Sequence, residues 1–477
     1  MTKSPCEFLK KRFFTSKEDI FFSSIDGKNY TYSDLLFYAN CIAKRWRKDG
    51  LNPGDCIAII LENSFAIPCF FLACVLGGFV ACPIVKKLPE TTIQGMLSRI
   101  NPALIIREQI EFDLLSEKNI DQDLFRSISS EQVFLSIFTS GTTGLPKIIR
   151  HKLGSIIGSA MAFSKLSCID KRTRLYHILP MCYMAGIVNA MFVPLMGGAT
   201  IVEGPEFSPA AAMDFWSRPL GLDVNFLSII PSIAASLCTF TRDKNVISEI
   251  QKKIIQIQCT SAPINIALRK RFFEKFGIPL QDCYGITELG GPLALQTKED
   301  ATSDKEGGTP IRGIEVDIRE EGALWIRSPF KMIGYFEDGK MTSYPFKNEF
   351  MDTGDLASYK NGKIRITGRT KDIIIRGGIN ISPVQLENKI SLMPGVCDVA
   401  VVGNAHDFWG EELVFCIIPI EDFLNNEKDF RKIVIGWSKK NLAPSEQPDR
   451  IELLDSFPRS FSGKVDKKEL RKRFVKL

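Results

Sequence analysis

Residues 133–147, VFLSIFTSGTTGLPK, join an apolar run to a loop of small hydroxyl residues, glycines and one lysine. The apolar run predicts a buried strand. Glycines and hydroxyls at a strand end let backbone N–H groups approach a phosphate chain closely, and Lys147 adds positive charge. The spacing Gly141-x2-Gly144-x2-Lys147 is not that of a Walker loop, because Ile148 stands where the metal-binding hydroxyl belongs. A flexible surface loop is the alternative, but the preceding core strand favours phosphate binding.

The N-terminal part of the chain alternates helical and strand patterns. From Ser33 the apolar residues keep helical spacing up to Trp46, and Gly50 follows as a stop signal. The apolar run CIAIIL then predicts a strand. Similar apolar strands are expected near 103–106, 134–138, 199–202 and 254–258. Such alternation predicts an α/β architecture.

Residues 65–85 run for 21 residues without a charge, which is long enough for a membrane span. Pro68, the pair Gly77-Gly78 and Pro83 interrupt this run. A buried helix to about Leu76, a glycine turn and a short core strand explain it better. We therefore expect no transmembrane segment here.

Composition excludes several classes of protein. The net charge of +6 is small for 477 residues, so nucleic-acid binding is not indicated. The 13 cysteines form no CxxC pair and only three histidines are present, which argues against a zinc site. Reduced, buried thiols and an N-terminus without the apolar core of a signal peptide predict a cytoplasmic protein.

The segment after Gly368 has the pattern of a separate small α+β unit. Strands are expected at 372–375, 398–402 and 413–420, and an amphipathic helix at about 427–441. Between them, Ser382-Pro383-Val384-Gln385 has the order of an N-cap, a proline at the first helical position and a capping-box glutamine. We therefore predict a large domain over 1–368 and a small domain over 369–477.

The loop at 139–147 resembles the phosphate loop of the adenylate-forming superfamily, which includes acyl-CoA synthetases, aryl-CoA ligases, luciferases and adenylation domains. The segment Tyr284-Gly-Ile-Thr-Glu288 resembles the family's next motif. The resemblance implies that Tyr284 lies along the adenine, that Thr287 contacts the α-phosphate and that Glu288 helps to hold Mg²⁺. A carboxylate suits that place, because Mg²⁺ prefers oxygen ligands.

Further motifs follow in the family's order. Thr353-Gly-Asp355 resembles the ribose site. Arg369 and Lys371 match the residue near the ribose and the interdomain hinge. Gly377 and Gly378 match the loop that lines the thiol tunnel, and Pro458–Lys464 matches the segment with the adenylation lysine. For Trp409, a place beside the thiol cofactor and a place in the core are equally good interpretations.

The candidate site residues fall into two groups. Lys464, Glu288 and Thr139 are the candidate catalytic residues, with Glu288 as the metal ligand. The candidate ATP- and AMP-binding residues are Thr139, Ser140, Gly141, Thr142, Thr143, Gly144, Lys147, Ser261, Ala262, Pro263, Tyr284, Gly285, Thr287, Asp355 and Arg369.

The sequence departs from the family pattern where the acid should bind. Tyr183 replaces the usual histidine or phenylalanine, and Thr260-Ser-Ala-Pro263 stands where two glycines usually precede Ala-Pro. No aspartate is present to hold an α-ammonium group, which argues against an amino acid. The expected pocket wall offers no counter-ion and therefore favours an uncharged aliphatic or aromatic tail. Its residues are Tyr183, Met184, Gly186, Phe226, Ser261 and Gly290.

These observations predict an ATP-dependent acid–thiol ligase that forms an acyl-adenylate and then an acyl thioester. ATP and Mg²⁺ are the implied cofactors, with coenzyme A as the expected acceptor. A ligase that loads an acyl-carrier protein remains open, because the same phosphopantetheine arm would be presented. A non-catalytic nucleotide-binding homologue is a more distant alternative, which intact Glu288, Asp355 and Lys464 disfavour. A luciferase-like oxidase would rest on fold analogy alone.

Overall fold

The computed structural model describes residues 4–108, 128–139, 147–208, 211–303, 307–337, 339–344, 346–420, 423, 427–459 and 464–474. Two large sheets form the body of the molecule. The nine-stranded sheet has the spatial order β14 (Thr309–Pro310), β13 (Gly291–Leu295), β12 (Leu280–Ile286), β11 (Gln256–Cys259), β10 (Phe226–Ile229), β8 (Arg174–His177), β9 (Thr200–Glu203), β1 (Ile20–Ser23) and β2 (Asn29–Thr31).

A seven-stranded sheet carries the candidate phosphate loop. Its order is β18 (Lys340–Thr342), β17 (Gly334–Glu337), β7 (Lys147–Lys152), β6 (Val133–Thr139), β4 (Val80–Pro83), β3 (Cys56–Ile59) and β5 (Leu104–Ile106). Strands β3, β4, β5 and β6 run parallel, and β7 turns back antiparallel to β6. The described ends of the loop, Thr139 and Lys147, therefore lie on neighbouring central strands of this sheet.

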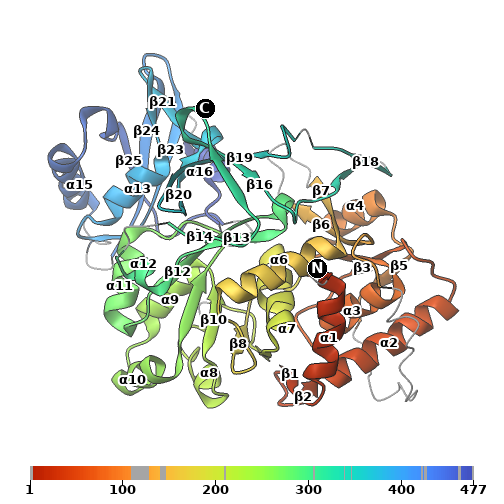
Figure 1. Cartoon of the computed structure of the whole chain (residues 1–477). Helices are drawn as coiled ribbons and strands as arrows, with labels where there is room; N and C mark the ends of the chain where they lie inside the picture. Colours follow the sequence, from red (N-terminus) through yellow and green to blue (C-terminus); the bar gives the residue numbers. More distant parts are fainter. Residues whose placement is uncertain are drawn as a thin grey trace.

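Helices pack between and around the two sheets (Figure 1). One continuous core contains side chains from both sheets and from the helices between them. The helices of the large domain are α1 (Pro5–Thr15), α2 (Tyr32–Lys48), α3 (Ala66–Gly77), α4 (Glu90–Ile100), α6 (Leu153–Leu166), the π-helix η2 (Ala185–Phe192), α7 (Val193–Gly197), α8 (Ser217–Gly221), α9 (Pro231–Phe240), α10 (Lys244–Lys253), α11 (Ile266–Phe276) and α12 (Lys298–Ser303).

The uncharged run at 65–85 folds as the sequence predicts. Every residue of α3 is buried. Gly78 ends the helix in the left-handed conformation with φ 73°, and β4 follows as a fully buried strand. Within the described ranges, no helix is long and apolar enough to cross a membrane.

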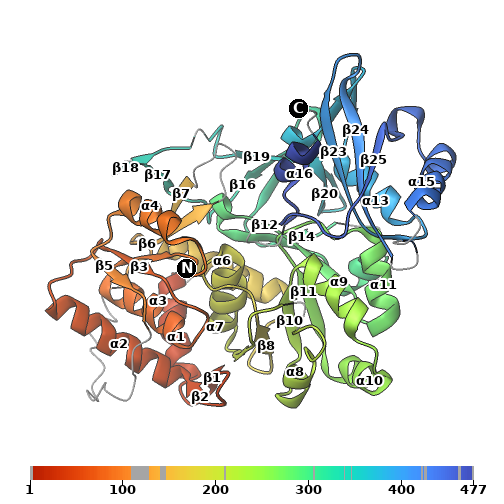
Figure 2. The same ribbon diagram turned by 180° about the vertical axis from the view of Figure 1, so that it is seen from behind.

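A four-stranded antiparallel sheet connects the body to a separate C-terminal lobe. It contains β15 (Glu315–Ile318), β16 (Ala323–Arg327), β19 (Met351–Lys360) and β20 (Lys363–Arg369). Figure 2 shows the lobe, in blue, above the nine-stranded sheet. Its elements are β21 (Ile374–Arg376), β22 (Ile379–Ile381), α13 (Pro383–Ser391), β23 (Val396–His406), β24 (Gly410–Pro419), α15 (Glu427–Asn441), β25 (Arg450–Leu453) and α16 (Lys467–Phe474).

The α/β fold with a large N-terminal and a small C-terminal part is confirmed. The lobe has its own hydrophobic core, formed by β21–β25, α13 and α15. Ser382 caps α13 by accepting a hydrogen bond from the Gln385 backbone, as predicted. The strand expected at 372–375 starts two residues later, because Thr370–Asp372 form a 3-10 turn.

Most of the cysteines are buried in this fold. All 13 are free thiols, and ten of them are buried, which agrees with the expected reduced state. Among the described residues, no group of His, Cys, Asp and Glu side chains has the arrangement of a metal site.

Candidate functional site

A buried carboxylate, Asp355, lies at the centre of the candidate nucleotide site. It is only 3% exposed, on β19 beside the end of β20. The Tyr284 hydroxyl donates to Asp355 Oδ2 at 2.7 Å, and Arg369 Nε donates to Asp355 Oδ1 at 2.9 Å. Burial, together with the Asp355 charge, raises the pKa of Tyr284 well above its usual range, so its phenol stays a donor. Three residues that are far apart in sequence are thus fixed in one cluster.

The pairing of strands explains why this cluster forms. Asp355 and Arg369 are direct partners in the β19–β20 ladder. The backbone N–H of Asp355 also donates to Thr353 Oγ1 at 3.1 Å, and that hydroxyl donates to the Leu324 carbonyl at 2.7 Å. The Asp355 carboxylate has two oxygens that each accept more than one hydrogen bond, so it keeps acceptor capacity for two ribose hydroxyls.

Glu288 belongs to a second cluster, which includes Lys147 at the end of the candidate phosphate loop. It lies half-buried in the 3-10 turn Thr287–Leu289, and the Tyr335 hydroxyl donates to Glu288 Oε1 at 3.4 Å. The Lys147 ammonium lies 4.6 Å from the centre of the Tyr335 ring. Tyr335 therefore connects Lys147 with Glu288.

Sequence reasoning missed Tyr335. It lies on β17, 47 residues from Glu288, and reaches the site because β17 pairs with β7. Burial and the Glu288 charge raise the pKa of Tyr335, which keeps the hydroxyl protonated. The only sequence signal was a glycine next to an aromatic residue, Gly334-Tyr335, which alone says nothing of a site.

The two ends of the candidate phosphate loop face each other. Thr139 at the end of β6 and Lys147 at the start of β7 are ladder partners, and Thr139 Oγ1 donates to the Lys147 carbonyl at 3.5 Å. The predicted residues Ser140, Gly141, Thr142, Thr143 and Gly144 lie outside the described part of the chain.

The segment expected to border the adenine lies beside Tyr284. Thr260 Oγ1 donates to the carbonyl of Cys283 at 3.4 Å. The next residue, Ser261, has φ 73°, a left-handed conformation that favours glycine. The serine therefore occupies a strained position on the short connection from β11 to α11. Ala262 is half-buried and Pro263 is exposed on the same connection.

Lys464 of the C-terminal lobe lies within electrostatic range of the nucleotide cluster. Its pKa is lowered, first by desolvation and next by the nearby positive charge of Arg369, while Asp355 and Glu288 oppose the change. An antiparallel bridge between Arg459 and Val465 holds the base of the segment that presents it.

Three of the expected acyl-pocket residues, Tyr183, Met184 and Gly186, lie at the start of the π-helix η2. A Cβ on Gly186 would overlap the Pro180 carbonyl oxygen, so this close backbone approach requires glycine. A Cβ on Gly290 would lie 2.7 Å from the Phe330 Cβ, and one on Gly291 would contact Met184 Cγ at 3.4 Å. Gly290 and Gly291 both have φ 97°. The wall is therefore made of closely packed backbone and apolar side chains.

Two buried histidines border this region, and neither supplies charge at neutral pH. Burial lowers the pKa of His177, near the Gly186 backbone, to about 4. It also lowers the pKa of His151, near the Thr287 backbone, to about 4. Cys283, which precedes Tyr284, has its pKa raised to about 12 by burial, so its thiol is neutral as well.

The predicted hinge lies between two sheets. Lys371 is exposed within the turn Thr370–Asp372, after the last strand of the four-stranded sheet and before the first strand of the lobe. Across this turn, Ser382 Oγ donates to the Thr367 carbonyl at 2.7 Å.

Gly377 and Gly378, with φ 57° and 79°, form the tight turn of the β21–β22 hairpin. A Cβ on Gly377 would lie 3.0 Å from the ring of Trp409. Trp409 is 40% exposed, so the interpretation as a core residue is wrong.

The residues present suit ATP with Mg²⁺. Glu288 is half-buried and makes one long hydrogen bond, so its carboxylate retains acceptor positions for a divalent cation. Lys147 adds a cation near it, and Asp355 adds a hydrogen-bonded acceptor for ribose.

Comparison with known proteins identifies the family. Residues 11–336 match the model of AMP-binding enzymes, and residues 385–464 match the C-terminal domain of AMP-binding enzymes. The first match alone covers more than half of the 477 residues, so the chain belongs to the AMP-binding enzyme family.

Relatives and solved structures agree with this assignment. The mitochondrial malonate–CoA ligase of Mus musculus is 26% identical over 93% of this chain and 87% of its own length. A long-chain-fatty-acid–CoA ligase of Mycobacterium tuberculosis is 27% identical over 93% of both chains. The o-succinylbenzoate–CoA synthetase of Bacillus subtilis, solved with its acyl-adenylate, has a TM-score of 0.78 at 23% identity, covering 100% and 98% of the two chains. The expected enzyme class, an AMP-forming acid–thiol ligase, is confirmed.

Proposed function

We propose that this enzyme adenylates a monocarboxylic acid with an uncharged tail and transfers the acyl group to coenzyme A. The observation that carries the proposal is the buried Asp355 carboxylate, which Tyr284 and Arg369 hold by hydrogen bonds of 2.7 and 2.9 Å within electrostatic range of Lys464. This is the arrangement that the first half-reaction needs.

In the first half-reaction an acid oxygen attacks the α-phosphorus of ATP, and pyrophosphate leaves. The attacking carboxylate and the triphosphate repel each other, and negative charge increases in the transition state. Lys464 attracts both groups and stabilises that charge. Its lowered pKa places its deprotonation, and the loss of this stabilisation, at a lower pH than for a free lysine.

Binding and orientation of the nucleotide are assigned to the large domain. Asp355 accepts hydrogen bonds from the ribose hydroxyls, and the Tyr284 ring lies along the adenine. Glu288 would hold Mg²⁺, which supplies charge neutralisation for the phosphate oxygens when it is bound. Thr139 and Lys147, at the two ends of the phosphate loop, position the triphosphate.

The absence of charge at the acyl pocket supports an uncharged acid tail. The described residues of the pocket wall include no lysine or arginine, and the bordering His177 is neutral at physiological pH. Some relatives are malonate–CoA ligases, whose substrate carries a second carboxylate. Burying such a charge without a cation is costly. A substrate like malonate is therefore disfavoured for this chain.

The second half-reaction requires a different arrangement of the lobe. The thiol attacks the acyl carbonyl, and AMP leaves with the bonding electrons. Rotation about Lys371 would move Lys464 away and bring the Gly377-Gly378 turn to the site. The bond from Ser382 to Thr367 would have to break during that rotation. Coenzyme A is the proposed acceptor, and a carrier-bound pantetheine is the other candidate.

A panel of acids tests the proposal. Pyrophosphate release is measured with straight-chain and aromatic monocarboxylic acids, each paired with the dicarboxylic acid of similar length, including malonate. We expect monocarboxylic acids to be turned over and dicarboxylic acids to be poor substrates. Adding free coenzyme A or a phosphopantetheinylated carrier then identifies the acceptor. Preferential turnover of malonate would contradict the assignment of an uncharged tail.

A further inference from the structure

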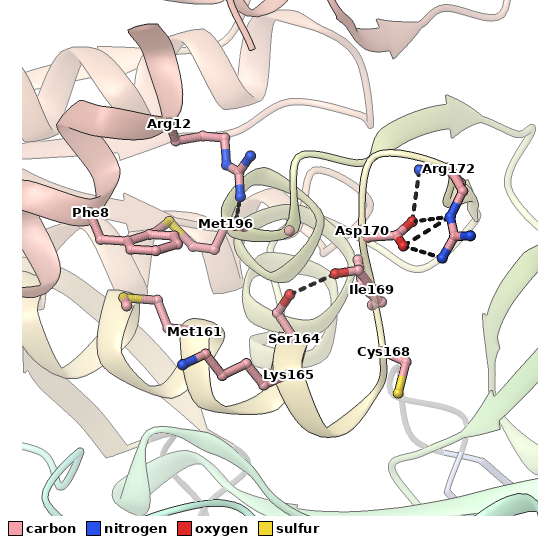
Figure 3. Close-up of a pocket in the computed structure, with 11 residues that line it drawn as sticks. Phe8, Arg12, Met161, Ser164, Lys165, Cys168, Ile169, Asp170, Arg172 and Met196 are labelled. Carbon is pink, nitrogen blue, oxygen red and sulfur yellow. Dashed lines mark hydrogen bonds and ion pairs between the residues drawn. The ribbon is translucent and has the colours of Figure 1, made fainter. Parts of the chain in front are cut away.

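A cavity of about 330 Å³ lies in the large domain between α1, α6 and the C-terminal end of α7 (Figure 3). Its volume is at the lower end of the range found for small-molecule sites. None of its lining residues belongs to the nucleotide site or to the acyl pocket.

One side of the cavity is apolar and adaptable. Phe8 from α1 and Met196 from α7 lie together, with Met161 from α6 facing them (Figure 3). Ile169, on the connection that follows α6, also lines the cavity. Methionine side chains are flexible and polarizable, so they adjust to the shape of an aliphatic tail.

The rest of the lining carries an excess of positive charge. Three cations, Arg12, Lys165 and Arg172, line the cavity with a single carboxylate, Asp170. Arg172 neutralises that carboxylate through bonds of 2.6 and 3.0 Å to Asp170 Oδ2. The other two cations, Arg12 and Lys165, therefore have no carboxylate partner in the cavity lining.

The bonding of these two cations is incomplete. Arg12 donates to the Met196 carbonyl at 2.6 Å and to Ser16 Oγ at 3.3 Å, and both acceptors are neutral. The buried Nε of Arg12 has no hydrogen-bond partner in the part of the chain that the structure describes. The Lys165 side chain is exposed and forms no ion pair with a described residue. A buried donor without a partner costs free energy unless a ligand satisfies it.

A purely structural role for the two cations is the alternative. Arg12 and Lys165 lie near the carbonyl ends of α7 and α6, where positive charge stabilises a helix. This role explains the charge but leaves the cavity and its methionine-lined side without a purpose.

We propose that this cavity binds a small amphipathic anion, a carboxylate with a short aliphatic tail. The anionic head lies between Arg12 and Lys165, and the tail packs against Phe8, Met161 and Met196. The site is separate from the acyl pocket, so the ligand is held without being adenylated.

Isothermal titration calorimetry of the whole chain with octane-1-sulfonate tests whether this site binds the probe. The probe carries an anionic head and an aliphatic tail but has no carboxylate to adenylate. We expect binding that weakens with rising salt concentration. Inorganic sulfate has the charge without the tail, and octyltrimethylammonium has the tail with the opposite charge. Both should bind much more weakly than the sulfonate.

Variants locate the bound probe. Lys165→Glu replaces an attraction by a repulsion at an exposed position, so sulfonate binding should weaken by about tenfold or more. Lys171→Glu, which makes the same charge change at a neighbouring exposed lysine that does not line the cavity, should bind like the wild type. Met161→Trp should abolish binding by filling the space. Acid-dependent pyrophosphate release verifies that each variant is folded. No binding by the wild type, or equal binding by Lys165→Glu, would overturn the proposal.

Discussion

Two regions of the large domain differ in character. Around Asp355, hydrogen bonds hold charged and phenolic side chains in position. Around Gly186 and Gly290, glycines and apolar side chains are in direct contact. The first region provides groups for charge and hydrogen bonding. The second region provides only an apolar surface of defined shape. We propose from this difference a division of labour in which the polar cluster binds the constant nucleotide and the apolar wall selects the acid. A change in either region should therefore affect a different kinetic quantity.

Lys464→Ala should give the largest effect, because it removes a cation that lies within electrostatic range of both Asp355 and Glu288. Acid-dependent pyrophosphate exchange should fall by roughly 10²–10³, as is typical for loss of one group that stabilises a transition state. Thioester formation from pre-made acyl-adenylate should fall much less. Lys468→Ala, at an exposed position on α16, is the matched control. Equal losses in both half-reactions would show that the role of Lys464 is wrong.

Glu288→Gln should have the next largest effect. Glutamine keeps the shape of the side chain but loses the charge that a Mg²⁺ ligand provides. Adenylation should fall by about 10 to 100-fold, the range for losing a charged interaction of 1.5–3 kcal/mol. Raising Mg²⁺ should restore part of the rate. Tyr335→Phe removes the hydroxyl that donates to Glu288 but leaves the charge, so its Mg²⁺ dependence should resemble that of the wild type. If Glu288→Gln also kept that dependence, Glu288 would have a structural role only.

Lys371→Pro should affect the two half-reactions differently, because they require different arrangements of the lobe. Proline fixes φ near −65° and removes a backbone N–H, so it should hinder rotation at the turn Thr370–Asp372. Pyrophosphate exchange should stay within about twofold of the wild type, while thioester formation falls by about tenfold, following the loss of hinge freedom. Lys371→Ala should leave both nearly unchanged. Normal thioester formation in the proline variant would remove the hinge and the domain boundary placed there.

Met184→Ala should affect only the choice of acid. The side chain borders Gly291 at the pocket wall, and its truncation opens space there. The ratio of kcat/KM for a larger acid to that for a smaller one should rise by about tenfold, since one methylene in such a pocket changes discrimination by about 1–3 kcal/mol. The KM for ATP should not change. A comparable change in the KM for ATP would contradict the proposed division of roles between the two regions.

Local patterns predicted much of this structure. The helix, glycine turn and strand at 65–85 follow from where glycine and proline interrupt an apolar run. Ser382 was identifiable as a helix cap because capping depends on residues within one turn. The separate C-terminal lobe was also expected, because the strand and helix patterns change after Gly368.

Contacts across the fold could not be predicted in this way. The link from Lys147 through Tyr335 to Glu288 depends on β17 pairing with β7, and no short window of sequence contains that information. The neutrality of His177 is another example. Its charge state depends on complete burial, which the fold determines and the residue type does not. The left-handed conformation of Ser261 likewise required the structure.

In the proposed acyl pocket, the π-helix η2 would make the number of residues in this segment a determinant of substrate choice. It is held by bonds from residue i+5 to residue i, as between Val193 N–H and the Val188 carbonyl, and so contains more residues per turn than an α-helix. Deleting one residue within it would restore α-helical bonding and rotate the upstream wall of the acyl pocket relative to α7. An insertion or deletion here can therefore reshape the pocket without replacing any wall residue. Residue-by-residue alignment of relatives through this segment would miss such a change.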